Sequence, residues 1–309
     1  MANTMKIQTV RGEISLTQLG KTNCHEHLLW YVPRPFAGED PDLGFDDSAK
    51  AIMELRHFAA AGGGAVVEMT TAEIGRDPLN LRNISEQTGV HIIAASGHHK
   101  DKFSASSLEK RSVDDIAQKI IEDISVGIDG TLIKAGVIKA ATSHHAATES
   151  ERKVIRAIGL AHQSTDAPVS THTEEGTFAL EQIELLLQAG VRANRLLIGH
   201  LDRNLPRETY IKIAAKGVWM GLDQVGKTKY WADEERAKLV NVLVETGHIG
   251  QILLSSDTAR KSSWHAYNPS VDGIANVLMK FTELLREKGL RDIDLQQLLV
   301  NNPAKFLAY

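Results

Sequence analysis

Short apolar runs alternate with longer amphipathic segments along the chain. Eight runs rich in β-branched and other apolar residues predict β-strands, at 22–28, 65–70, 91–97, 133–139, 168–173, 195–200, 217–223 and 251–257. Between them apolar residues recur at helical spacing, which predicts helices at 46–61, 78–88, 112–125, 148–164, 176–188, 206–216 and 234–246. A segment at 270–288 completes the eighth unit, and a short helix is expected near 295–299.

Regular alternation of strands and helices requires parallel strands joined by helical crossovers. An open doubly wound sheet would need a glycine-rich phosphate loop after its first strand, but the residues there read HEHLLW. Eight units therefore favour a closed barrel, a fold that runs to about 250 residues and accepts insertions. We expect an α/β fold, a (β/α)8 TIM barrel, with residues 1–309 in a single domain.

Titratable side chains stand near the carboxyl ends of most of these strands, where the loops of such a barrel build the active site. They are His25, His27, Glu68, Lys139, His172, His200, Asp223 and Asp257. His25 and His27 are two residues apart, so both imidazoles are expected on one face of the strand, with Cys24 and Glu26 on the other. This pair, with further strand-end histidines and Asp257, indicates a metal site rather than isolated core histidines.

Lys139 is expected at the inner end of its strand, where an ammonium group beside cations would be unfavourable. A neutral amine that has reacted with carbon dioxide would instead be a carbamate, an anionic ligand able to bridge two metal ions. The alternatives are a lysine that extends to the barrel mouth or one that binds an anionic substrate. Two ions with a bridging hydroxide would activate water and polarise an electrophile, and Asp257 would accept the proton. This chemistry predicts hydrolysis of an activated carbonyl or phosphoryl centre.

Across essentially the whole chain these motifs resemble the phosphotriesterase-like branch of the amidohydrolase superfamily. The matching segments are NCHEH (23–27), EIGRD (73–77), KAGVIKAAT (134–142), VSTHT (169–173), IGH (198–200), GLD (221–223), ILLSSD (252–257) and NNPAKFL (301–307). The resemblance implies two divalent ions, zinc by the usual expectation, with His25, His27 and Asp257 on the more buried ion and His172 and His200 on the other. It also implies a carboxylated lysine, N6-carboxylysine, at Lys139 as the bridge, and a homodimer.

Two positions depart from the triesterases of this family, which carry a histidine after GLD and an aromatic residue in the loop after the third strand. Gln224 and His99 stand there instead, so His99 is expected to face the substrate. The last two loops read DQVGKTKYWADEER and DTARKSSWHAYNP. They are closer to phosphotriesterase homology proteins and to relatives that act on phosphorylated sugar lactones.

These last two loops also carry Lys227, Lys229, Tyr230 and Arg260, in the region where such barrels often bind phosphate. Arginine offers a two-pronged hydrogen-bond donor for phosphate, which makes Arg260 the first candidate for an anionic group. The favoured function is a lactonase for a small sugar lactone that bears a phosphate or other anionic group. The alternatives are an organophosphate triesterase or carboxylesterase, and a non-catalytic metal-binding barrel. The charged loops are equally consistent with solvated surface.

Bulk composition fits a small-molecule enzyme. The 309 residues are 42% hydrophobic and 24% charged with a net charge of -4, so no basic surplus indicates nucleic acid or an anionic membrane as partner. The N-terminus lacks a signal-like apolar run, and no stretch approaches the roughly 18 apolar residues of a membrane span. The single cysteine, Cys24, suits a reducing compartment, so a cytoplasmic location is expected. The roles of Glu68 and Asp223, as ligand-orienting or barrel-filling groups, stay open.

Overall fold

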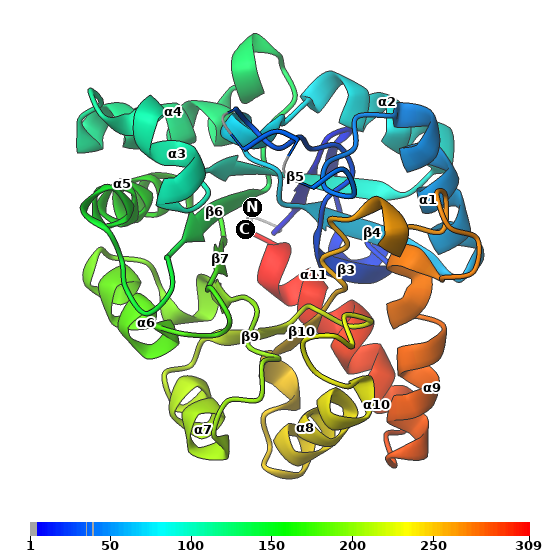
Figure 1. Ribbon diagram of the computed structural model, residues 1–309. Helices are drawn as coiled ribbons and strands as arrows, with labels where there is room; N and C mark the ends of the chain where they lie inside the picture. The colour runs from blue at the N-terminus through cyan, green and yellow to red at the C-terminus, as the bar shows by residue number, and fades with distance from the viewer. Residues whose placement is uncertain (1–4, 35, 39) are drawn as a thin grey trace.

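A ring of eight parallel strands forms the centre of the computed structural model, which describes residues 5–34, 36–38 and 40–309 (Figure 1). The strands are β3 (Lys21–Glu26), β4 (Gly63–Glu68), β5 (His91–Gly97), β6 (Val137–Ala141), β7 (Val169–His172), β8 (Leu196–Ile198), β9 (Trp219–Leu222) and β10 (Ile252–Leu254). Each pairs in parallel with the next along the chain. The eight expected strands are all present, and the prediction of a (β/α)8 TIM barrel is confirmed.

The barrel closes where β10 meets β3. The backbone N–H of His25 donates to Ser255 Oγ at 2.9 Å, and the Ser255 hydroxyl donates to the His25 carbonyl at 2.7 Å. The N–H of Asp257 donates to the same carbonyl at 3.1 Å. The closing seam therefore joins two segments that carry predicted metal ligands.

Helices surround the ring (Figure 1). They are α1 (Ser48–Ala60), α2 (Pro78–Thr88), α3 (Asp101–Leu108), α4 (Val113–Ser125), α5 (Glu149–Thr165), α6 (Ala179–Gln188), α7 (Arg207–Ala215), α8 (Asp233–Glu245) and α9 (Lys280–Glu287). Most match the expected segments within a few residues. The sequence did not predict α3, because only Ser104 and Leu108 of this helix are buried and so it has almost no apolar periodicity.

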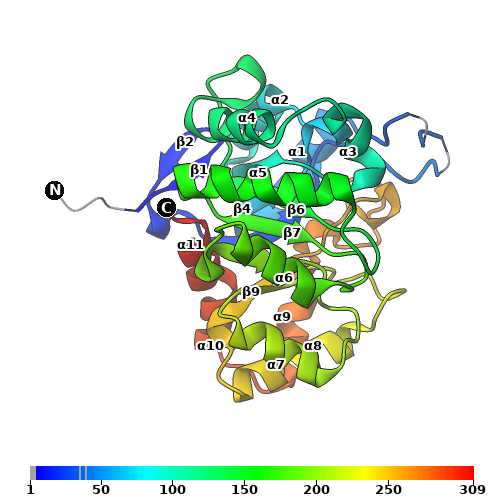
Figure 2. The ribbon, with the colours of Figure 1, turned by 90° about the vertical axis from the view of Figure 1, so that its left-hand side faces the viewer.

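Small elements cover the end of the barrel that holds the two termini (Figure 2). They are the antiparallel hairpin of β1 (Ile7–Thr9) and β2 (Gly12–Ile14), followed at the C-terminus by α10 (Asp292–Gln296), a π-helical turn (Gln297–Asn301) and α11 (Asn302–Leu307). Ile7, Phe306 and Leu307 pack in one apolar cluster with barrel residues such as Val67 and Leu253. The carboxyl ends of the strands, with their loops, lie at the opposite end.

The larger apolar core lies between the outer faces of the strands and the helices. Leu55, Ile84, Ile158 and Ile213 are among its fully buried members. Removal of such side chains from water, at about 25 cal/mol per Å² of apolar surface, is the main favourable term in folding. Within the described part of the chain, no helix combines the length and apolar character needed to cross a membrane.

Candidate metal centre

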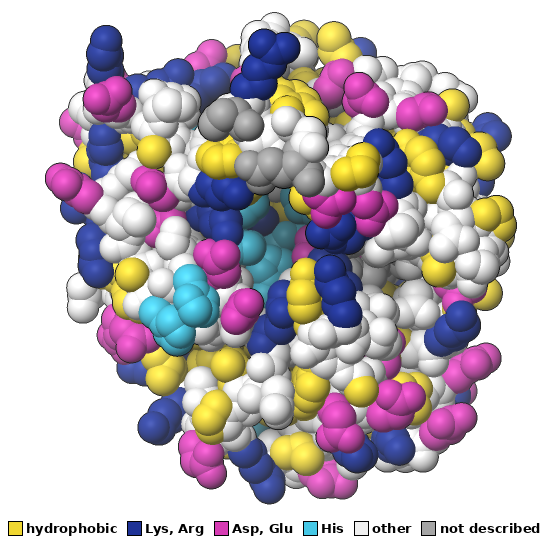
Figure 3. Space-filling model, in the orientation of Figure 1, with side chains coloured by type: hydrophobic (Ala, Val, Ile, Leu, Met, Phe, Trp, Pro, Cys, Tyr) yellow, Lys and Arg dark blue, Asp and Glu magenta, His cyan; other side chains and the backbone are white. Residues whose placement is uncertain are grey.

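The carboxyl ends of the strands bring the predicted metal ligands to one cavity of about 300 Å³. The predicted ligands that line it are His25, His27, Lys139, His172, His200 and Asp257. Seen from this end of the barrel, histidines lie at the bottom of a central hollow, and both Lys or Arg and Asp or Glu side chains border it (Figure 3). Residues up to 232 positions apart in the sequence (from 25 to 257) thus share one site.

β3 is irregular where it presents its histidines. Asn23 pairs with Val66 and Glu26 pairs with Glu68, so β3 advances three residues where β4 advances two. The extra residue in β3 forms a β-bulge. Cys24 packs with Val67 in the apolar cluster of the barrel, although its neighbour His25 lines the cavity. The expectation that Cys24 faces away from His25 is therefore wrong, because the bulge interrupts the two-residue alternation of the strand.

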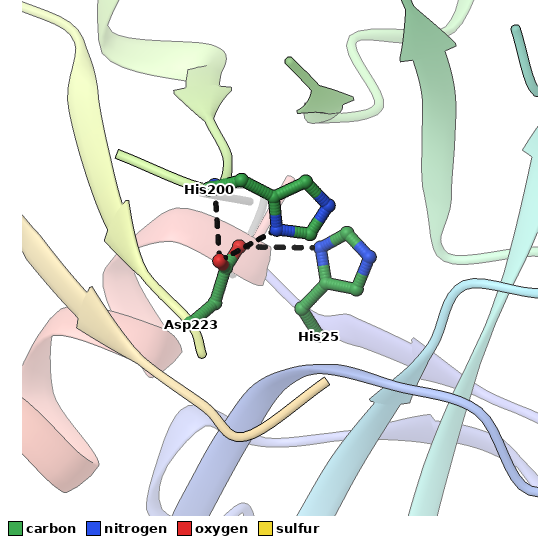
Figure 4. A group of neighbouring side chains, drawn as sticks. All are labelled: His25, His200 and Asp223. Atoms are coloured by element: carbon green, nitrogen blue, oxygen red, sulfur yellow. Dashed lines mark hydrogen bonds and ion pairs between the residues drawn. The ribbon is translucent and has the colours of Figure 1, made fainter. Parts of the chain in front are cut away.

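Asp223, directly after β9, contacts two of the histidines (Figure 4). Its Oδ1 accepts hydrogen bonds from the backbone N–H of His200 at 2.9 Å and from Nδ1 of His200 at 2.8 Å. Its Oδ2 lies 3.3 Å from His25 Nδ1. A Cβ at Gly199 or Gly221 would lie 3.0 Å from Oδ2, so these glycines leave room for the carboxylate.

This geometry assigns Asp223 an orienting role. Although burial opposes ionisation, His200 and His25 lower the pKa of Asp223 well below its usual value. His25, His200 and Asp223 are close enough to hold an ion themselves. However, the carboxylate already accepts the Nδ1–H of His200 and lies beside Nδ1 of His25, and this leaves each Nε2 as the donor atom for a metal.

Glu68 acts on His27 through Thr70. Nδ1 of His27 lies 2.8 Å from Thr70 Oγ1, and the Thr70 hydroxyl donates to Glu68 Oε1 at 2.5 Å. Glu68 also accepts the N–H of Leu28 at 3.1 Å, and burial raises the pKa of Glu68 to about 7. The contacts keep the Nδ1 proton on the Thr70 side, so that Nε2 of His27 faces Asp257 Oδ1 at 3.7 Å.

The donor set fits a divalent transition metal. The side chains of His25, His27 and Asp257 form a buried group whose ligand atoms lie within 4.8 Å of one another. The Nε2 atom of His172 is buried and has no hydrogen-bond partner among the described residues. Imidazole nitrogens with their second nitrogen held by another group, together with a carboxylate, are typical of such sites.

Lys139 lies within this cluster. Its side chain is almost wholly buried, and Nζ lies 3.1 Å from His25 Nε2. Burial lowers the pKa of Lys139 to about 8, although neighbouring carboxylates oppose the shift. A lysine in this place can act on a bound ion only as a neutral amine or after a modification that removes its positive charge.

Two of the predicted ligands have strained backbones. His200 has φ of 58° and Asp257 has φ of 47°, in the left-handed region that residues with a side chain seldom adopt. Such strain costs of the order of 1–3 kcal/mol and persists only where other contacts hold it, most often at functional sites. Here Asp223 holds the N–H of His200, and the His25 carbonyl holds the N–H of Asp257.

Three of the five predicted substrate contacts line the metal-site cavity: His99, Lys227 and Tyr230. The N–H of Lys100 donates to His99 Nδ1 at 2.7 Å, which leaves a proton on Nε2, and burial lowers the pKa of His99 well below its usual value. The Lys227 ammonium is paired with Asp257. Although burial opposes ionisation, Lys227 lowers the pKa of Asp257 well below its usual value.

Arg260 and Lys229 instead line an adjoining cavity, which shares Lys227, Tyr230 and Ala259 with the metal-site cavity. The Nη1 atom of Arg260 lies 2.7 Å from Asp40 Oδ2 and 3.3 Å from Asp42 Oδ2. The expectation that Arg260 is the first anion contact beside the metals is not supported, because two carboxylates from the loop after β3 already occupy its guanidinium.

Four charged residues of the metal-site cavity were not predicted from the sequence: Lys100, Glu174, Glu175 and Arg203. The spacing of Arg203 from a predicted metal ligand could have identified it as a residue of the site. It stands three residues after His200, just as Arg260 stands three residues after Asp257. A cation at this offset from a strand-end ligand lies in the loop that borders the site.

Comparison with known proteins agrees with this site. The sequence matches the phosphotriesterase family over residues 5–307. The phosphotriesterase homology protein of Escherichia coli is 32% identical over 95% of this chain and 99% of its own length. Its crystal structure, with phosphate in the active site, has a TM-score of 0.89 at 32% identity, covering 94% of this chain and 99% of that chain.

Two further relatives carry the names of hydrolases. The crystal structure of a lactonase from Listeria monocytogenes has a TM-score of 0.92 and 32% identity, covering 98% of both chains. The N-acetyltaurine hydrolase of Pongo abelii is 30% identical over 98% of both chains. This chain belongs to the phosphotriesterase family and is a phosphotriesterase-like hydrolase.

Proposed function

We propose that this protein is a binuclear-metal-dependent lactonase for a small lactone that bears a phosphate or other anionic group. The observation that carries the proposal is the cavity of about 300 Å³, which combines the predicted ligand cluster with the cationic side chains Lys100, Arg203 and Lys227. That volume is at the small end for ligand pockets. The similarity of the whole chain to the Listeria lactonase, at 32% identity, supports the same reaction class.

In this proposal His25, His27 and Asp257 hold one ion and His172 and His200 hold the other, with a carboxylated Lys139 between them. When bound, the ions, zinc by expectation, would polarise the lactone carbonyl and activate water. The carbamate is supported by the burial of the Lys139 amine beside His25, where an ammonium group would oppose metal binding.

The chain's own residues would then position the substrate and move one proton. Oδ2 of Asp257, which Lys227 keeps as a carboxylate, would accept the proton of the attacking water and return it to the ring oxygen when the acyl C–O bond of the lactone breaks. The Nε2–H of His99 would donate a hydrogen bond to a ring oxygen or hydroxyl of the substrate. Lys227 and Tyr230 would line the path from the metals to the adjoining cavity, where a longer substrate would reach Lys229.

The test is a kinetic screen of the zinc-loaded protein. Sugar lactones with and without a phosphate group should be compared with aryl phosphotriesters and simple carboxylic esters, and Lys139→Met serves as the metal-site control. We expect kcat/KM for a phosphorylated lactone to be at least tenfold above that for its neutral counterpart, and Lys139→Met to abolish both activities. Equal or higher activity on phosphotriesters would overturn the proposal. We expect low activity on phosphotriesters, because triesterases of the family carry a histidine at the position of Gln224.

A second candidate is hydrolysis of an amide that bears a sulfonate. The Pongo abelii relative named N-acetyltaurine hydrolase favours it, since it covers 98% of this chain at 30% identity. Sulfonate and phosphate are both tetrahedral oxyanions, so the same cationic cavity would suit either. N-acetyltaurine in the same screen separates the two, because hydrolysis of this amide without lactone hydrolysis would select the second candidate.

A further inference from the structure

Besides Lys139, three cationic side chains line the cavity of the metal centre, but their charges differ in availability. Lys100 Nζ lies 2.7 Å from Glu174 Oε1, and Lys227 is paired with Asp257. Arg203 forms no ion pair with any carboxylate in the part of the chain that the structure describes. Its Nε is buried and has no hydrogen-bond partner there. The guanidinium therefore has unused donors on the cavity wall.

The guanidinium of Arg203 lies over the ring of Tyr230. Its Cζ lies 3.7 Å from the centre of the Tyr230 ring, the close face-on contact of a cation–π pair. Tyr230 lines the same cavity and also the adjoining one. Stacking fixes the plane of the guanidinium but does not use its N–H groups, so the fork remains free for a ligand.

The loop that carries Arg203 is anchored on the N-terminal side of this residue. The neighbouring Asp202 accepts a hydrogen bond from Arg236 Nε at 2.7 Å and another from the N–H of Gln224 at 2.9 Å. Asp202 and Arg236 are both completely buried. The ion pair ties the loop after β8 to α8, which limits the motion of the Arg203 backbone.

Tyr210 anchors both ends of the same loop. Its hydroxyl donates to the Leu201 carbonyl at 2.8 Å and accepts the N–H of Leu205 at 3.2 Å. Arg203 lies between these two residues. A cationic fork on a loop held in this way loses little conformational entropy when it binds, which is the usual requirement for a tight anion contact.

Arg260, the other arginine near the site, is in the opposite electrostatic situation. Its one positive charge faces two carboxylates, those of Asp40 and Asp42. An approaching anion would therefore meet a group with net negative charge, unless Asp40 and Asp42 moved away. Arg203 forms no such ion pair among the described residues and lies in the cavity of the predicted metal ligands themselves, which Glu174 and Glu175 also line.

We propose that Arg203, stacked on Tyr230, is the residue that selects anionic substrates, and that it binds the two oxygens of a phosphate monoester through its guanidinium fork. The proposal rests on the proposed function in that the anion belongs to the substrate whose ester or amide bond is cleaved. Arg203 takes no part in bond cleavage. It sets affinity for the charged end of the molecule, so its loss should raise KM and leave kcat nearly unchanged.

The test measures binding separately from hydrolysis. Ribose 5-phosphate serves as a non-hydrolysable probe for isothermal titration of the zinc-loaded protein. Arg203→Met should weaken its binding roughly tenfold to hundredfold, the usual range for a lost charge-assisted pair, and Arg203→Lys should recover part of the affinity. Arg260→Met and Arg207→Met, the latter at an exposed position at the start of α7, should each change it less than threefold.

Kinetics with a lactone in phosphorylated and neutral forms complete the test. Arg203→Met should raise KM for the phosphorylated form by a similar factor and leave kcat/KM for the neutral form within twofold. The proposal is overturned if Arg203→Met binds ribose 5-phosphate as the wild type does, if the wild type does not bind it, or if Arg260→Met has the larger effect. Arg203-dependent binding without any lactone hydrolysis would sustain this proposal and refute the lactonase.

Discussion

The carboxylate of Glu26 holds the seam of the barrel together at the metal centre, and its replacement by glutamine tests this arrangement. Oε1 accepts hydrogen bonds from the side chains of Asn23 and Ser256 at 2.8 and 2.7 Å and from the N–H of Ser256 at 3.0 Å, and it shares the single Ser255 hydroxyl proton, at 2.8 Å, with the His25 carbonyl. Oε2 accepts the N–H and the hydroxyl of Thr258 at 3.1 and 3.0 Å. Six donors thus converge on one fully buried side chain, and Asp257 lies between two of the residues that provide them.

The expected loss of stability follows from these contacts. In Glu26→Gln an NH2 group replaces one of the two oxygens. If this NH2 group faces Thr258, the backbone N–H of Thr258 loses its acceptor. A lost hydrogen bond to a charged group contributes about 1.5–3 kcal/mol, and an unsatisfied buried N–H about 1–3 kcal/mol. Burial raises the pKa of Glu26 because it disfavours the charged carboxylate. Removal of the charge in Glu26→Gln therefore offsets part of this loss of stability. We expect a net loss of about 3 kcal/mol, or a fall in Tm of about 6 °C.

Metal binding distinguishes this role from a merely structural one. A looser Asp257 should reduce zinc affinity roughly 10- to 100-fold, as is usual when a partner of a metal ligand is removed. Glu54→Gln is the matched control, because Glu54 is also a buried carboxylate that accepts two backbone N–H groups, those of Ala266 at 2.8 Å and Ile274 at 2.9 Å. It should lower Tm but leave zinc affinity within twofold.

The assays are thermal unfolding and titration of zinc into the metal-depleted protein, each with wild type and both variants. A loss of stability below about 1 kcal/mol in Glu26→Gln, or an equal weakening of zinc binding in the two variants, would contradict this role of Glu26. Either result would mean that the six hydrogen bonds do not set the position of Asp257.

Three further predictions follow from the same geometry. Asp223→Ala should weaken zinc binding roughly 10- to 100-fold in a chelator competition, since the side chain orients ligands, whereas complete loss of one ion would identify it as a ligand. Glu68 has its pKa raised to about 7, so the folded state binds its proton more tightly than the unfolded state and stability falls as pH rises from about 4.5 to 7. Urea unfolding at pH 4.5–8 should show this decline reduced in Glu68→Gln, and parallel curves would contradict it. Arg236→Met should lower the unfolding free energy by about 3–5 kcal/mol because it leaves Asp202 buried and unpaired, and Asp202→Asn in the same chain should restore part of it; additive losses would exclude the coupling.

Much of the fold and the ligand cluster could be predicted because both depend on local sequence patterns. A parallel strand covered on both sides is a short apolar run, and a polar residue at its end falls at the barrel rim whatever the rest of the chain does. His25, His27, His172, His200 and Asp257 were identified in this way and lie together in the structure. Elements with weak periodicity, such as α3 and the β1–β2 hairpin, were missed for the same reason.

Local sequence patterns are therefore enough to specify the barrel and the kind of donor atoms at its rim. Which neighbour each charge meets depends on the three-dimensional arrangement of segments that are remote in the chain. Arg260 is paired by carboxylates 218 and 220 residues away, and Glu26 is bound by donors about 230 residues away, whereas Arg203 is left without a carboxylate among the described residues. Electrostatic and hydrogen-bond energies depend on distances of a few ångströms between segments remote in the chain, and such distances are set only when the barrel closes.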